Sequence, residues 1–109
     1  LRSLESSEAY TGMIDGKVVA CAGAYEVAHQ RFVAWAYLGI DARKHMLLIT
    51  RAIKRWFSMF ECRRLEAHVD CNFSEAHRWI QMFGFELECE RMKSFTPDGR
   101  DCALYAIVR

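Results

Sequence analysis

The chain has 109 residues, enough for one hydrophobic core but not for two. With 52% hydrophobic residues, one Pro and six Gly, the composition predicts a compact, largely regular chain rather than a disordered one. The formal net charge of +1 argues against nucleic-acid binding driven by overall charge, and no apolar run approaches the roughly 20 residues of a membrane span. We expect a single domain over residues 1–109, located in the cytoplasm.

The first residues read as part of a longer protein. The segment LRSLESSEAY begins with Leu and as though within a helix. Residues 1–8 are therefore expected to be the end of an N-terminal helix or a tail, and we expect the natural protein to have a preceding portion.

Three antiparallel strands are predicted next. Strands over about 9–14 and 17–25 flank Asp15-Gly16, a strong signal for a tight hairpin. A third strand, about 31–40, consists of aromatic and β-branched residues in RFVAWAYLGI.

A long helix and a fourth strand follow. Apolar residues recur at helical spacing over about 42–60, namely at Met46, Ile49, Ile53, Trp56, Phe57 and Phe60. Over 64–70 the pattern changes to alternation, with Leu65, Ala67 and Val69 on one face and Glu66, His68 and Asp70 on the other.

The segment NFSEAHRWIQMFGFELE predicts a second helix. Asn72 is a suitable N-cap and Glu75 follows at the spacing of a capping box. Gly84 suits the left-handed position after the helix. The chain then ends in a hairpin whose turn is TPDGR.

The order β-β-β-α-β-α-β-β and the late motif together resemble the GCN5-related N-acetyltransferase (GNAT) superfamily. Its familiar ending is approximately N-x-x-A-x-x-x-Y-x-x-x-GF, and Asn72, Ala76, Gly84 and Phe85 match it with one extra residue between Asn and Ala. The resemblance covers about residues 9–109 and implies an α+β fold, a mixed, mostly antiparallel sheet flanked by helices. The family's first strand and helices would be missing.

A narrower likeness is to the acetyltransferase-like internal virion proteins of short-tailed phages. It rests on FVAWAYLG, the long basic helix and N-x-S-x-x-x-R-W-I-Q-M-F-G. This likeness implies a location in the host cytoplasm or the virion, with self-association or other virion proteins as partners.

The GNAT resemblance implies acetyl-CoA or CoA as ligand, in a cleft between strands 31–40 and 64–70. The pyrophosphate would bind amides at the start of the helix near 42–46, as anions do at helix N-termini. Acetyl transfer to an amine would be direct, with a base and an acid assisting. The residues expected to bind the cofactor are Leu38, Ile40, Arg43, Lys44, His45, Met46 and Asn72.

Two features of the family pattern are absent. The pyrophosphate loop is approximately [Q/R]-x-x-G-x-[G/A], and if Arg43 takes its first place, Met46 and Leu48 replace the small residues. The general-acid Tyr is expected four residues before the glycine of GF, where this sequence has Ile80. Activity is therefore in question.

Catalytic candidates nevertheless remain. Glu66, His68 or Asp70 could act as the base, and Tyr37 could replace the acid; the alternative is a polar strand face without catalytic work. Arg43, Lys44 and His45 could face an anion or be solvated. His77 is expected on the helix surface or in packing.

Three functions stay open: an N-acetyltransferase acting on an unknown amine, a catalytically degenerate structural or interaction protein, and a module that binds acyl-CoA without turnover. Aromatic residues could line a pocket but are more often core; they are Trp35, Tyr37, Trp56 and Trp79. A solvated basic face is favoured over a nucleic-acid site for Arg51, Lys54, Arg55, Arg63 and Arg64.

Overall fold

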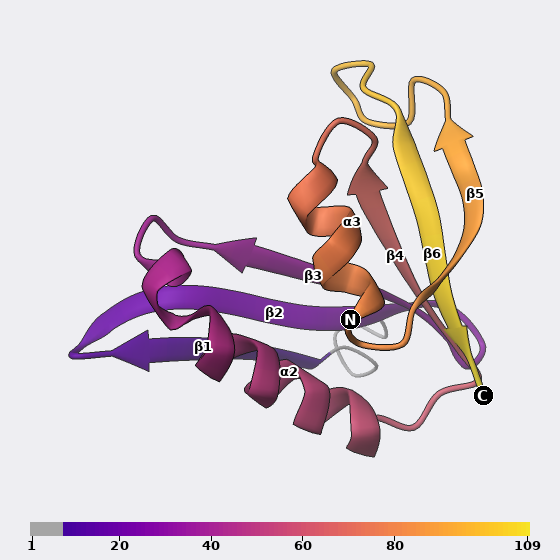
Figure 1. The fold of residues 1–109 in the computed structure, drawn as a ribbon. Coiled ribbons are helices and arrows are strands. Elements are labelled where there is room, and N and C mark those ends of the chain that lie inside the picture. The colour runs from indigo at the N-terminus through magenta and orange to yellow at the C-terminus, as the bar shows by residue number, and fades with distance from the viewer. Residues whose placement is uncertain (1–7) are drawn as a thin grey trace. The chain divides into compact units, whose positions relative to one another are not determined.

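A computed structural model describes residues 8–109 (Figure 1). The chain divides into two compact units, Leu1–Glu61 and Cys62–Arg109. The expected helix end or tail at residues 1–8 lies outside the described residues, apart from Glu8, which begins the first strand. The single domain over 1–109 stays a prediction.

The N-terminal unit contains an antiparallel three-stranded arrangement of β1 (Glu8–Ile14), β2 (Lys17–Ala28) and β3 (Arg31–Leu38). The predicted hairpin is confirmed, since Asp15 and Gly16 have φ values of +52° and +78°. Positive φ at both residues is typical of the two-residue hairpin turn whose backbone twist matches that of the flanking strands.

The predicted helix over 42–60 is confirmed, with its first turn in the tighter 3-10 form. A 3-10 turn, η1 (Ala42–His45), leads into α2 (Met46–Met59). The helix ends where Phe60 becomes extended and its amide donates to the Trp56 carbonyl at 2.9 Å. Its buried face is formed by Ile49, Thr50, Ile53 and Phe57.

Aromatic packing supports this face. The Trp56 ring lies 4.9 Å from the Phe57 ring and 5.5 Å from those of Tyr10 and Phe60, measured between centroids. Trp56 is therefore a packing residue, as the sequence favoured. Trp35 keeps 40% of its surface exposed and is not a core residue.

The C-terminal unit contains β4 (Arg64–Asp70), α3 (Ser74–Gln81), β5 (Glu86–Met92) and β6 (Cys102–Val108). β6 is the middle strand and pairs antiparallel with β4 and β5, while α3 packs against β4 (Figure 1). The predicted buried face of β4 is confirmed at Leu65, Ala67 and Val69. The α+β class and the element order are thus as predicted.

The predicted N-cap of α3 is wrong. The helix begins at Ser74 with Phe73 in the N-cap position, and no side chain caps it. The Asn72 amide instead donates to Asp70 Oδ1 at 2.9 Å, and the Phe73 amide donates to the Asp70 carbonyl at 3.0 Å. This turn, organised by the Asp70 carboxylate, delays the helix start and leaves Asn72 outside it.

The end of α3 agrees with the sequence in conformation but not in position. Gly84 has φ +93°, the left-handed value expected of it. The helix ends earlier, at Gln81, and the Met82, Phe83 and Gly84 amides each donate to the carbonyl three residues back. Gly84 therefore reverses the chain after a tight terminal turn.

Candidate functional site

The residues expected to bind a cofactor lie together in the N-terminal unit, apart from Asn72. Tyr37 and Leu38 end β3, with 64% and 37% of their surfaces exposed. Ile40 follows in the connection to η1 and is 99% exposed. These three residues therefore present side-chain surface at the end of β3.

The start of the helical segment is cationic. Arg43 and Lys44 are exposed, His45 is half-buried, and no carboxylate occurs between Ala42 and Phe60. Cations at a helix start are unfavourable by about 0.3–1 kcal/mol, which a bound anion would offset. Asp41 occupies the N-cap position of η1 but makes no side-chain cap bond.

Some backbone amides at the start of η1 already donate hydrogen bonds within the protein. The Ala42 amide donates to the Gly39 carbonyl at 3.0 Å, and the Lys44 amide donates to the Asp41 carbonyl at 3.3 Å. Met46, in a position where the family motif has glycine, is half-buried. The residues present therefore fit a phosphate through basic side chains better than through an open glycine loop.

In the C-terminal unit, Glu66 is only 3% exposed and is held by Arg64. Arg64 Nε donates to Glu66 Oε2 at 2.5 Å, and the same guanidinium donates to both carboxylate oxygens of Glu88 on β5. Hydrogen bonding from Arg64 lowers the pKa of Glu88. Glu66 is thus a buried, ion-paired carboxylate rather than an open polar residue.

His68 and Asp70 follow Glu66 on the same strand face but are engaged differently. The exposed His68 ring meets the Phe95 ring edge-to-face, with centroids 4.7 Å apart. Asp70 Oδ2 accepts from Arg100 Nη1 at 2.9 Å, while Oδ1 accepts from the Asn72 amide. The three predicted base candidates therefore share β4 and have three different partners.

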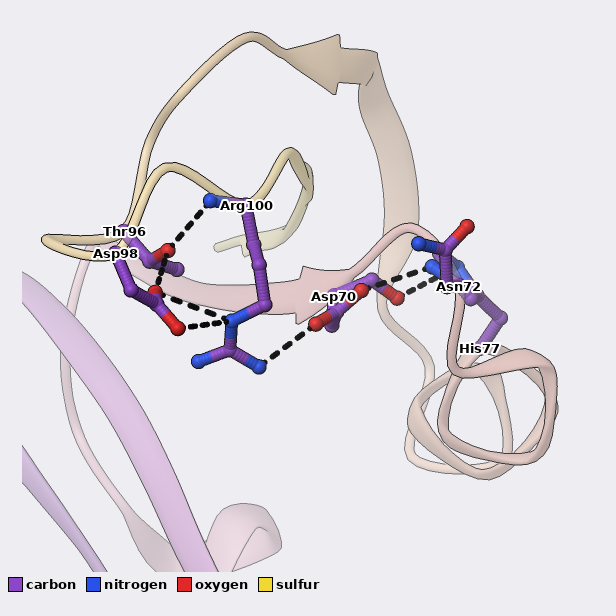
Figure 2. A network of polar contacts seen from close by, with 6 residues as sticks. All are labelled: Asp70, Asn72, His77, Thr96, Asp98 and Arg100. Carbon is purple, nitrogen blue, oxygen red and sulfur yellow. Dashed lines mark hydrogen bonds and ion pairs between the residues drawn. The ribbon is translucent and has the colours of Figure 1, made fainter.

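A polar network around Arg100 was not foreseen from the sequence (Figure 2). Arg100 Nε donates to both oxygens of Asp98 at 3.1 and 3.0 Å, and its amide donates to Thr96 Oγ1 at 2.8 Å. The pKa of Asp98 is lowered by the Thr96 hydroxyl and then by Arg100. Asp98 and Arg100 are close in the turn, but no sequence signal joins Arg100 to Asp70.

His77 is a bonding residue between elements, consistent with the predicted packing role. Its Nε2 lies 3.0 Å from the Asp70 carbonyl and its Nδ1 lies 2.7 Å from the Tyr105 hydroxyl. Because a carbonyl only accepts, Nε2 must carry the proton, and in the neutral ring Nδ1 accepts from Tyr105. Figure 2 shows His77 reaching from α3 toward the end of β4.

All five cysteines are free thiols; Cys62 and Cys102 are buried, and the other three are half-buried. Burial raises the pKa of Cys62 and of Cys102. Among residues 8–109, no group of three or more His, Cys, Asp or Glu side chains is arranged to hold a metal ion. No helix within the same range is long and apolar enough to cross a membrane.

The strand and helix order defines the class: this is the GNAT-like, acyl-CoA N-acyltransferase fold. Several solved structures share this fold over most of the length of the present chain. The microcin self-immunity acetyltransferase MccE, in complex with acetyl-CoA and AMP, matches 97% of this chain and 63% of its own with TM-score 0.82 and 14% identity. RimL, a ribosomal alpha-N-protein acetyltransferase in complex with coenzyme A, matches 96% and 63% with TM-score 0.80 and 11% identity.

A spermidine N-acetyltransferase chimera from Vibrio cholerae SpeG and hSSAT matches 95% of this chain and 68% of its own, with TM-score 0.74 and 13% identity. The chain thus spans about two thirds of the length of these proteins. No family model and no curated protein sequence matches it. At these identities the likeness shows the fold, and it adds no support to the phage virion interpretation, which stays a prediction.

Proposed function

We propose that the protein is an acyl-CoA-dependent N-acetyltransferase that transfers acetyl directly to an amine. The observation that supports this most is the match over 97% of the chain to an acetyltransferase in complex with acetyl-CoA. The same fold recurs in structures named as a spermidine N-acetyltransferase and as an alpha-N-protein acetyltransferase. The acceptor amine here is left open, and the proposed location is the cytoplasm.

The N-terminal unit would bind the acetyl-CoA. Arg43 and Lys44, exposed at the start of a helical segment without carboxylates, would contact its phosphates. Backbone groups near Leu38 and Ile40 would pair with the pantetheine chain, and His45 and Met46 would contribute amides. In the other unit, Asn72 is assigned to cofactor binding only by its place in the motif.

His68 is the preferred base of the three β4 candidates, because both oxygens of the Asp70 carboxylate already accept hydrogen bonds, from Arg100 and from the Asn72 amide. Its imidazole is exposed, and histidine side chains in general accept and release protons near neutral pH, whereas the Glu66 carboxylate is buried against Arg64. The amine nitrogen would attack the thioester carbonyl as His68 takes its proton. The carbon–sulfur bond then breaks, and the CoA thiolate leaves and takes up a proton, for which Tyr37 is the candidate donor.

A second function is favoured by a specific observation. Ile80, half-buried on α3, offers no proton where the family has its acid Tyr, and Met46 replaces a motif glycine. A degenerate member that binds CoA without turnover, or serves as a structural or interaction protein, would have these features. Self-association or virion partners belong to this second candidate.

Charge reversal tests the cofactor assignment. The variant Arg43→Glu/Lys44→Glu is expected to weaken CoA binding at least tenfold, a loss of about 1.4 kcal/mol. The matched control is Arg51→Glu/Lys54→Glu, which makes the same change in net charge on exposed residues of α2. Equal weakening by both double variants would contradict a local phosphate contact.

Thiol release from acetyl-CoA with a panel of amines separates the two functions. Turnover that falls roughly 10²- to 10⁴-fold in His68→Gln, with CoA affinity unchanged, is the result expected of a general base. CoA binding without thiol release for any amine would favour the degenerate member. Unchanged turnover in His68→Gln would remove His68 from the proposal.

A further inference from the structure

The loop between β5 and β6 contains a turn that is closed by backbone hydrogen bonds. The Phe95 amide donates to the Arg100 carbonyl at 2.8 Å, so these two residues form the closing pair of the turn. Inside it the Gly99 amide donates to the Thr96 carbonyl at 2.9 Å, and Gly99 has φ +85°. The side chains of Phe95 and Arg100 therefore start from one hydrogen-bonded pair of backbone residues in the hairpin loop.

Both members of this pair contact β4. Phe95 meets the His68 ring with centroids 4.7 Å apart, and Arg100 Nη1 donates to Asp70 Oδ2 at 2.9 Å. His68 and Asp70 are two residues apart on one strand, so their side chains lie on the same face. One charged and one aromatic contact thus attach the turn to neighbouring positions of the strand.

Each partner of the Arg100–Asp70 ion pair makes a further hydrogen bond that orients it. Asp98 receives two hydrogen bonds from Arg100 Nε, which leaves Nη1 directed at Asp70 (Figure 2). The other Asp70 oxygen accepts from the Asn72 amide at 2.9 Å, which fixes the carboxylate. Because guanidinium and carboxylate are both fixed by further bonds, little side-chain freedom is lost in forming the pair.

We propose that Arg100 is a positioning residue, which through its ion pair with Asp70 holds Phe95 against the His68 ring and so fixes the imidazole for proton transfer. The catalytic consequence rests on the proposed acetyltransferase function. The positioning itself is a property of the C-terminal unit and can be measured without any substrate.

The substrate-free test is NMR of the full chain labelled on histidine rings, with His68 assigned by His68→Gln. Phe95→Leu removes the neighbouring ring and calibrates the ring-current displacement of the His68 signals. Arg100→Gln and Asp70→Asn are each expected to move these signals in the direction of Phe95→Leu. Arg100→Lys keeps the positive charge but cannot bond Asp98 and Asp70 in the same geometry. Its His68 signals are expected to lie between those of Arg100→Gln and those of the parent protein.

Arg91→Gln is the matched control, because Arg91 lies in the same hairpin and pairs with Asp101 at 2.5 Å rather than with Asp70. Its His68 signals should stay at their parent positions. His68 signals that do not move in Arg100→Gln and Asp70→Asn would overturn the positioning role. So would an equal displacement in Arg91→Gln, which would show a general loosening of the hairpin.

An activity measurement extends the test to the proposed function. Arg100→Gln is expected to lower kcat roughly ten- to hundredfold, with the KM for acetyl-CoA unchanged. A raised KM with unchanged kcat would contradict positioning for proton transfer. If no amine is acetylated at all, the proposed function fails while the NMR result still decides whether Arg100 positions His68.

Discussion

Replacing Arg64 by Met should destabilise the protein in a way that depends on pH. Arg64 bridges the Glu66 carboxylate, whose side chain is 4% exposed, and the more exposed Glu88. Hydrogen bonds to charged groups contribute about 1.5–3 kcal/mol, and breaking a buried pair costs about 3–5 kcal/mol. The Arg64 side chain is itself 27% exposed, so we expect the smaller of these two ranges to apply, a loss of about 2 kcal/mol in the free energy of unfolding at neutral pH.

The sign of the pH dependence follows from the two carboxylates. Without Arg64, the buried Glu66 carboxylate would lose its cationic partner, so its charged form would be disfavoured in the folded state; this penalty is absent in acid, where the carboxyl is protonated, and present at neutral pH. In the parent protein Arg64 lowers the pKa of Glu88, a contribution that is present above about pH 4.3 and lost as the pH falls. Both effects make the difference in stability largest at neutral pH.

Urea unfolding followed by tryptophan fluorescence at several pH values measures this difference. A loss of about 2 kcal/mol corresponds to a decrease in Tm of roughly 8 °C for a chain of this size. The control is Arg63→Met, the same change at the adjacent exposed arginine. Parent-like stability of Arg64→Met at pH 7, or a deficit of constant size from pH 4 to pH 8, would refute the reasoning.

Three further results are expected. Tyr105→Phe removes the hydroxyl 2.7 Å from His77 Nδ1 and should cost about 1 kcal/mol in urea unfolding; no change would mean that this bond adds nothing. Gly84→Ala should destabilise by about 1–2 kcal/mol because φ is +93° while the space around the added methyl is open, and a stabilised variant would contradict this. Cys62 and Cys102, buried and with raised pKa, should react with a thiol reagent more slowly than the other three cysteines, as peptide mapping of the labelled protein would show.

The fold could be predicted well where local chemistry decides it. Asp15-Gly16 adopts the positive φ values of its hairpin, and 64–70 is a strand with the predicted bounds. The start of α3 could not be predicted as well, because a turn that accepts hydrogen bonds at Asp70 precedes the helix. Asn72 looks like an N-cap in isolation, but the Asp70 carboxylate takes the Asn72 amide and the helix begins later.

The candidate site was predictable by position more than by contact. Alternation correctly placed Glu66 and His68 on one strand, yet it assigned both to a polar face, and Glu66 is buried with Arg64. Contacts between segments that are far apart in the chain produce no repeating pattern in the sequence. The pair of Arg100 and Asp70 joins residues thirty positions apart, so only the folded hairpin reveals it.

Thermal unfolding of the full chain in the presence of acetyl-CoA or CoA tests the central claim most directly. A ligand that binds only the folded state adds about 2.7 kcal/mol of apparent stability at 100 times its dissociation constant. The proposed function predicts a Tm that rises with the logarithm of ligand concentration for acetyl-CoA and for CoA. A Tm that does not move at millimolar concentrations of either ligand would contradict acyl-CoA binding and, with it, the proposed acetyl transfer.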